Sequence, residues 1–154
     1  MNITIRPARL SDKDIIADFN AAIARETEHV ELNRERLIAG IEALLSDHAK
    51  GFYLLAESSG RVVGQTMITY EWSDWRNGTF WWIQSVYVHP DFRKGGVFTQ
   101  LFRRIEKEAK QRADVCGLRL YVERRNARAQ LTYEKLGMKK TIYDLYESDF
   151  VLHR

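Results

Sequence analysis

The chain has 154 residues, of which 45% are hydrophobic, with 24 Lys and Arg against 21 Asp and Glu. These values are ordinary for a globular protein with one hydrophobic core. The single cysteine excludes an internal disulfide, and a net charge of +3 is modest for a protein that binds nucleic acid.

One domain spanning residues 1–154 is predicted, because the chain has only two prolines and no repeat or low-complexity linker. No apolar run is long enough to cross a bilayer. The charged residues Arg6, Arg9, Asp12 and Asp14 are not typical of a secretory signal. We therefore expect a cytoplasmic protein with no membrane partner.

Alternating and helical patterns predict the first elements in chain order. Residues 3–6 form a strand, residues 11–28 a helix, and a second helix follows Asn33 with an apolar stripe at 3-4-3 spacing. Three strands follow, at residues 52–57, 61–70 and 79–88, joined by turns at Gly60 and at Asn77-Gly78. These strands form an antiparallel meander.

The second half of the chain continues with two helices and three strands. A helix begins at Val97, and another spans residues 127–136. Strands are predicted at residues 118–123, 139–142 and 144–150. The fold class is α/β (α+β), with a mixed, mostly antiparallel central sheet of six to seven strands flanked by about four helices.

A basic loop with two glycines connects a strand to a helix at residues 86–99. Gly95 and Gly96 allow the backbone to approach an anion closely, and the helix N-terminus supplies free N–H groups and a positive dipole end. The loop matches neither the Walker pattern nor the dinucleotide fingerprint. It is equally compatible with a pyrophosphate cradle and with a simple strand-to-helix turn.

A second segment, residues 120–138, places a short helix after a strand. Asn126 is a good N-cap, and Gly137 suits the left-handed residue that ends the helix. Tyr133 lies two turns after Asn126, so both residues project from one face. Each residue taken alone is explained by capping or by packing.

Together the two segments resemble the GCN5-related N-acetyltransferases, the GNAT superfamily. Residues 93–98, Arg-Lys-Gly-Gly-Val-Phe, are similar to its R/Q-x-x-G-x-G/A loop, and residues 126–137 to its N-x-x-A-x-x-x-Y-E-x-x-G segment. The resemblance extends from the first predicted strand to the last. Phe98 replaces the usual small residue, so its ring must turn away from the phosphates. Met138 stands where Phe is common.

The resemblance implies an acetyl-CoA-dependent N-acyltransferase that transfers an acetyl group directly to a primary amine of a small molecule or peptide. Tyr133 would protonate the departing thiolate, because a phenol is protonated at neutral pH. Asn126 would bind pantetheine or position Tyr133. The other cofactor-binding residues that the resemblance implies are Val86, Tyr87, Val88, Arg93, Lys94, Gly95, Gly96, Val97, Phe98 and Thr99.

The general base is the least defined group. Glu71 is the first candidate, since it follows the strand that ends at Tyr70, and a second acidic cluster with His29 lies at residues 26–31. The four histidines and Cys116 show no metal-ligand spacing, so no metal is expected. The identity of the amine acceptor is left open, and a homodimer is compatible with the resemblance.

Two other classes of function remain open. A non-catalytic acyl-CoA-binding module would need the glycine loop but not Tyr133. A basic nucleic-acid-binding domain would use Arg119, Arg124, Arg125 and Arg128, although no known nucleic-acid motif occurs. The charges of the helix after the glycine loop alternate in sign, which is typical of a solvated face, so no nucleic acid is expected.

Overall fold

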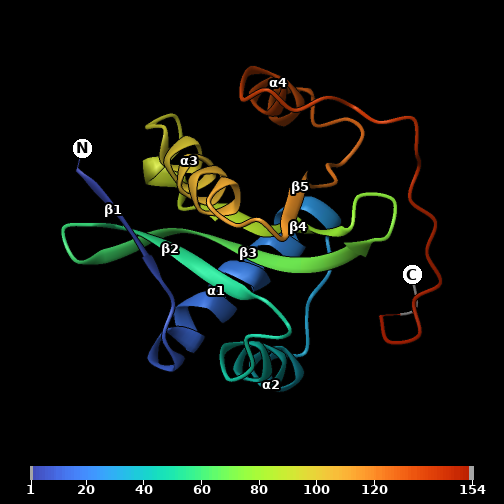
Figure 1. Cartoon of the computed structure of the whole chain (residues 1–154). Coiled ribbons are helices and arrows are strands. Elements are labelled where there is room, and N and C mark those ends of the chain that lie inside the picture. Colours follow the sequence, from blue (N-terminus) through green and yellow to red (C-terminus); the bar gives the residue numbers. More distant parts are fainter. Residues whose placement is uncertain (1, 153–154) are drawn as a thin grey trace. The chain divides into compact units, whose positions relative to one another are not determined.

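A five-stranded mixed sheet organises the first part of the chain, as the computed structural model shows (Figure 1). The structure describes residues 2–152, which fall into two compact units, residues 2–121 and residues 122–152. The strand order is β1-β2-β3-β4-β5. The first four strands pair antiparallel, and β5 pairs parallel with β4. The prediction of a mixed, mostly antiparallel sheet is confirmed.

The strands follow the predicted chain order with small shifts of their ends. Their bounds are β1 Ile3–Pro7, β2 Phe52–Ser58, β3 Arg61–Ser73, β4 Gly78–Val88 and β5 Val115–Arg119. The β3–β4 hairpin closes on the pair Ser73 and Gly78, and Asn77 in its turn has φ 46°. Asn is among the side chains that tolerate this left-handed backbone.

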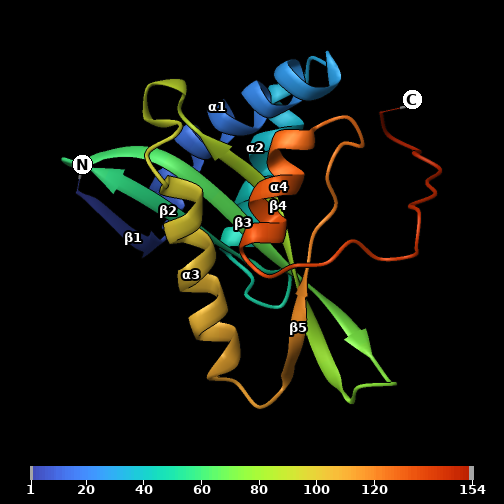
Figure 2. The same cartoon turned by 90° about the horizontal axis from the view of Figure 1, so that it is seen from above.

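Helices cover both faces of this sheet (Figure 2). Helix α1, Lys13–Ile23, continues into a π-helical turn, Ala24–Glu28, and packs with α2, Arg34–Leu45, on one face. Helix α3, Val97–Lys110, lies on the other face. Apolar side chains from α1, α2 and β2 form a buried cluster: Ile16, Ala17, Ile41, Leu44, Tyr53 and Leu55.

The second unit contains one helix, α4, Ala127–Lys135, within its described residues. With α1, α2 and α3 this makes four α-helices over residues 2–152, as predicted. Asn126 caps α4, since its Oδ1 accepts the backbone N–H of Ala129 at 3.1 Å. Gly137 follows with φ 97°, the left-handed conformation expected after a helix end.

The prediction of six to seven strands is wrong, because residues 139–142 and 144–150 form no strand in the described chain. Their large apolar side chains lie in solvent, with Ile142 93%, Tyr146 94% and Phe150 86% exposed. An alternating pattern of apolar and polar residues forms a strand only where the edge of a sheet is available to pair with it. The local sequence does not record whether such an edge is available. The strand predicted at residues 118–123 is observed earlier, as β5.

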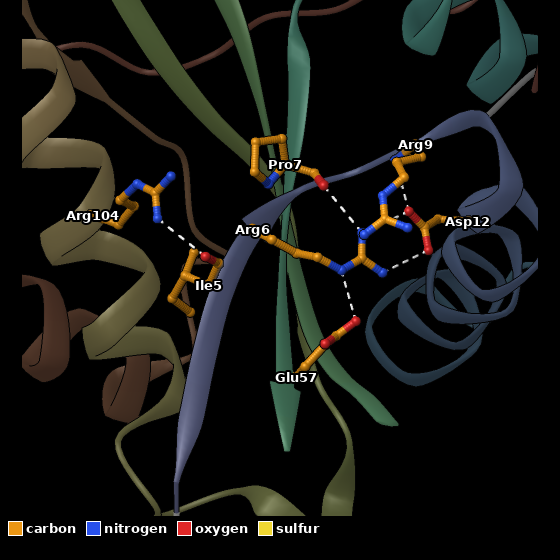
Figure 3. Close-up of polar contacts among 7 residues, drawn as sticks. All are labelled: Ile5, Arg6, Pro7, Arg9, Asp12, Glu57 and Arg104. Carbon is orange, nitrogen blue, oxygen red and sulfur yellow. Dashed lines mark hydrogen bonds and ion pairs between the residues drawn. The ribbon is translucent and has the colours of Figure 1, made fainter. Parts of the chain in front are cut away.

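A half-buried arginine ties β1 to its neighbours (Figure 3). The guanidinium of Arg6 donates to both carboxylate oxygens of Asp12 at 2.9 Å, and to Glu57 Oε1 at 2.7 Å. The side chains of Arg6 and Asp12 are only 18% and 11% exposed. A bidentate, largely desolvated pair of this kind holds the start of the first helix against the strand. The Arg6 guanidinium holds the pKa of the Asp12 carboxyl below its usual value of 3.8.

We predict that Asp12→Asn lowers the free energy of unfolding by about 2 kcal/mol at pH 7, because charged hydrogen bonds of a half-buried group are lost. Since the pKa of Asp12 is depressed in the folded state, its contribution is present above pH 3.8 and disappears as pH falls further. Urea unfolding of both proteins between pH 7 and pH 2.5 measures the difference.

The matched control is Asp18→Asn, which removes a carboxylate from the exposed ion pair with Arg34. Exposed pairs contribute little, so this change should cost less than about 1 kcal/mol. An equal loss in the two variants at pH 7, or a gap for Asp12→Asn that does not narrow as the pH falls to 2.5, would contradict the role given to the pair.

Candidate functional site

The glycine turn before α3 is held in left-handed backbone conformations. Lys94 has φ 71° and Gly96 has φ 77°, and Gly96 is the residue that caps α3. The first helical bond of α3 runs from the N–H of Gln100 to the carbonyl of Gly96. The N–H groups of the residues between them therefore lie at the helix start without an intrahelical acceptor. This is the geometry of an anion site.

Space is available at this helix start. A Cβ built on Gly96 would meet no heavy atom within 4 Å. The ring of Phe98 packs against the buried Phe102 at 6.2 Å between centroids, rather than over the turn. Phe98, which stands where the family usually has a small residue, therefore leaves the turn open. Its ring is turned away from the turn, as expected from the sequence.

Strand β4 has an open edge next to this turn. Pairing between β4 and β5 ends at Trp82 and Arg119, whereas β4 continues to Val88. Because His89 N–H donates towards β3, to Val63, the N–H and C=O of Val88 point to the opposite edge. The Val88 carbonyl there accepts a bond from Arg93 Nε at 2.8 Å.

A bulge bends β4 at Ser85. The register with β3 advances by two residues, from Gln65 to Met67, while β4 changes by three, from Tyr87 to Gln84. Ser85 has φ 51°, and its carbonyl accepts Nε2 of the fully buried Gln65 at 3.0 Å. Since bulges bend a strand and increase its twist, this one accounts for the separation of β4 from β5.

The π-helical turn contributes a carboxylate to the glycine turn. Glu26 accepts Arg93 Nη2 at 3.0 Å, and the Tyr87 hydroxyl also hydrogen-bonds to Glu26. The Arg93 guanidinium lies 5.2 Å from the centre of the Tyr87 ring. Burial, followed by the Glu26 carboxylate, raises the pKa of Tyr87. From the sequence, Glu26 is only one of several acidic residues at residues 26–31. Its pairing with Arg93, 67 positions away, could not be predicted because no local pattern links the two residues.

Glu71 lies on β3, on the same face as Met67, because the two are four residues apart in a regular stretch. This spacing corresponds to about 13 Å along the strand. Its Oε1 accepts Arg119 Nη1 at 2.5 Å and Trp82 Nε1 at 3.1 Å. Both donors stabilise the carboxylate, so Glu71 sits in an ion pair rather than alone.

Of the two predicted residues of the second unit, Asn126 caps α4 and Tyr133 lies within it. Asn126 uses its Oδ1 as the helix cap and is exposed. Tyr133 is half-buried, and burial raises the pKa of its hydroxyl above the usual 10. The phenol is therefore protonated at neutral pH and can donate a proton.

Three of the four arginines considered for nucleic acid are paired with carboxylates, and Arg128 is not among them. Arg119 pairs with Glu71, Arg124 with Asp144 at 3.0 Å, and Arg125 with Glu123 at 3.1 Å. The charges of α3 are also paired within the helix, for example Arg104 Nε with Glu108 at 2.6 Å. These pairs reduce the positive charge of the surface that such a function would need.

Between residues 2 and 152, no group of three or more His, Cys, Asp or Glu side chains is arranged to hold a metal ion. No helix over the same residues is both long and apolar enough to cross a bilayer.

Residues 16–138 match the acetyltransferase (GNAT) family. The chain belongs to this family. A crystal structure of a possible acetyltransferase from Clostridium difficile 630 is 46% identical, with a TM-score of 0.89 over 98% of this chain and 99% of that chain. No curated protein matches the chain. The glycine turn and the open edge of β4 are thus features of a family member.

Two more distant structures share the fold. A predicted acetyltransferase with acetyl-CoA from Clostridium acetobutylicum is 19% identical, with a TM-score of 0.78 and 96% of each chain covered. A ribosomal-protein-alanine N-acetyltransferase from Brucella melitensis biovar Abortus 2308 is 21% identical, with a TM-score of 0.77 over 97% of this chain and 99% of that chain.

We predict that Gly96→Ala weakens acetyl-CoA binding at least tenfold, because its Cβ would occupy the open space at the start of α3 and strain a φ of 77°. Gly60→Ala is the matched control. Gly60 also has φ 77° and no heavy atom within 4 Å of a built Cβ, but it lies in the β2–β3 turn.

Both variants should lose a similar amount of stability, about 1–2 kcal/mol, because both force a side chain into left-handed backbone. Isothermal calorimetry of acetyl-CoA binding to both variants then separates the effect of backbone strain from the effect of a changed binding site. Equal affinities of Gly96→Ala and Gly60→Ala for acetyl-CoA would show that the glycine turn does not hold the cofactor.

Proposed function

We propose that the protein is an acetyl-CoA-dependent N-acetyltransferase that transfers the acetyl group directly to a primary amine. Membership of the acetyltransferase family supports the reaction class. The observation that carries the proposal is the open edge of β4 beside the glycine turn, where an extended amide chain and a pyrophosphate can be held together. The Clostridium acetobutylicum relative with acetyl-CoA supports the choice of donor.

The residues of this turn and edge suit acetyl-CoA. The N–H groups at the start of α3, from Val97 to Thr99, together with Gly95 and Gly96, would bind the pyrophosphate. Lys94 would add charge to this site, and Arg93 would do so after exchanging its bond to Glu26. Val86 and Val88 would pair with the amide groups of pantetheine along the open edge, with Tyr87 holding the turn beside them.

Acetyl-CoA supplies an activated acyl group as a thioester. The backbone N–H of Val86 or Val88 would stabilise the negative charge that develops on the acyl oxygen. Tyr133 would hold the proton that the leaving thiolate needs, because burial keeps its hydroxyl protonated at neutral pH. Asn126 would fix the start of the helix that carries Tyr133. One C–N bond forms as the C–S bond breaks.

The incoming ammonium must lose a proton, and Glu71 remains our first candidate for the general base. Its bond to Arg119 favours action through an intervening water rather than direct contact with the amine. Glu26 is the alternative candidate for the general base, since it lies beside the glycine turn. A cytoplasmic location and a homodimer are further expectations of this proposal.

The first test is thermal unfolding with and without acetyl-CoA. A ligand at 100 times its dissociation constant stabilises the folded state by about 2.7 kcal/mol, so the melting temperature should rise by several degrees. Thiol release with a panel of amines then separates an enzyme from a non-catalytic binding module. No shift at millimolar acetyl-CoA would overturn the proposal.

We predict that Tyr133→Phe retains acetyl-CoA affinity and loses turnover by about a hundredfold, which is typical when a general acid is removed. Activity of the parent protein should fall at high pH, as Tyr133 loses its proton above pH 10. Tyr146→Phe is the control, since Tyr146 is 94% exposed. Turnover of Tyr133→Phe equal to that of Tyr146→Phe would remove Tyr133 from the acid role.

A further inference from the structure

A cavity of about 310 Å³ lies within the first unit, between the α1–α2 layer and the sheet. Its apolar wall is formed by Leu37, Ile41 and Leu44 of α2 and by Met67 of β3. The volume is at the lower end of the range for small-molecule sites. It corresponds to roughly ten water-sized groups, which is the size of an amino acid.

One side of the cavity is polar. Tyr53, 4% exposed, accepts a bond from Asn20 Nδ2 at 3.1 Å and hydrogen-bonds to Ser85. All three residues line the cavity, so they form one polar patch in its wall. Ser85 is the bulged residue of β4 and directly precedes Val86. This patch therefore adjoins the edge at which we place the acyl group, and its oxygens can accept hydrogen bonds from an ammonium.

Arg36 is the charged residue of the lining. Its side chain is exposed and makes no ion pair within residues 2–152. By contrast, Arg34, two positions earlier on α2, pairs with Asp18 at 2.8 Å. A guanidinium without a carboxylate at an apolar cavity is suited to bind an anion of the ligand. The planar guanidinium of Arg36 can form two parallel hydrogen bonds with one carboxylate. A doubly charged phosphate would need further cations.

Gly40 keeps the α2 side of the cavity open. It lies in the interior of α2, where glycine is unfavourable relative to alanine, and it lines the cavity. A Cβ built there would meet no heavy atom within 4 Å. The position therefore has room for a larger side chain, and a larger side chain there would narrow the cavity.

We propose that this cavity binds the acetyl acceptor, and that the acceptor is a small amino carboxylate with an apolar body. Its carboxylate pairs with Arg36, its apolar body contacts Leu37 and Met67, and its amine lies at the Tyr53–Ser85 patch. The assignment of this ligand as an acceptor rests on the proposed function. The binding of an apolar amino carboxylate does not.

Calorimetry without acetyl-CoA tests the binding itself. The probes are leucine, phenylalanine and 6-aminohexanoate, each beside its amide and the amine that lacks the carboxylate. We expect at least one amino carboxylate to bind at least tenfold more tightly than its uncharged counterparts. Arg36→Gln should abolish this preference, and Arg34→Gln, which removes the same charge from the same helix, should leave it intact.

Two variants of Gly40 test the cavity independently. Gly40→Ala should raise the melting temperature by about 2–4 °C, because helix propensity improves. Gly40→Leu should remain folded and weaken binding of the amino carboxylate at least tenfold, because its side chain narrows the cavity. Equal binding by Gly40→Leu and the parent protein would overturn the placement.

The failures of the two proposals are distinguishable. If acetyl-CoA raises the melting temperature but no amino carboxylate binds, or amines bind equally without their carboxylate, this inference is wrong and the acetyltransferase proposal stands. If an amino carboxylate binds through Arg36 but is not acetylated and acetyl-CoA gives no shift, the cavity stands and the proposed function fails.

Discussion

The extra residue in β4 at Ser85 is the constraint on which the site depends. A non-glycine residue with φ 51° costs about 1–2 kcal/mol, and the buried amide of Gln65 offsets part of this cost by bonding its carbonyl. The bend ends the pairing of β4 with β5 and leaves the backbone of Val86 and Val88 on an open edge. The same residue, Ser85, lines the cavity on the helical face. One local distortion thus serves both proposed ligands.

Ion pairs determine which charged side chains are available for chemistry. Glu71 and Arg119 neutralise one another, as do Glu26 and Arg93. Arg6 is enclosed by two carboxylates and holds β1 to the start of the first helix. Arg36 differs, since it lines a cavity and has no such partner in the described chain. The unpaired charge of Arg36 at the cavity is therefore more informative about function than the net charge of the chain.

The glycine turn illustrates why residue type and backbone conformation must be read together. Lys94 and Gly96 both adopt positive φ, but only glycine does so without strain. The strain at Lys94 is of the kind that persists at binding sites when the surrounding structure enforces it. Phe98 is accommodated because Phe102 is one turn further along α3 and receives its ring. The large Phe98 side chain, which departs from the family pattern, is therefore accommodated by packing within α3 and does not change the turn.

The sequence alone determined the family, the order of elements from β1 to α4, the start of the second helix after Asn33, the cap at Asn126 and the glycine turn, because each depends on residues that are close in the chain. Tertiary structure decided the pairing of Glu26 with Arg93, the ion pair that encloses Glu71, and the cavity beside Arg36. It also decided that residues 139–150 form no strand. Partners separated by tens of residues meet only after the sheet has formed, and no local pattern records which edge or charge will face them.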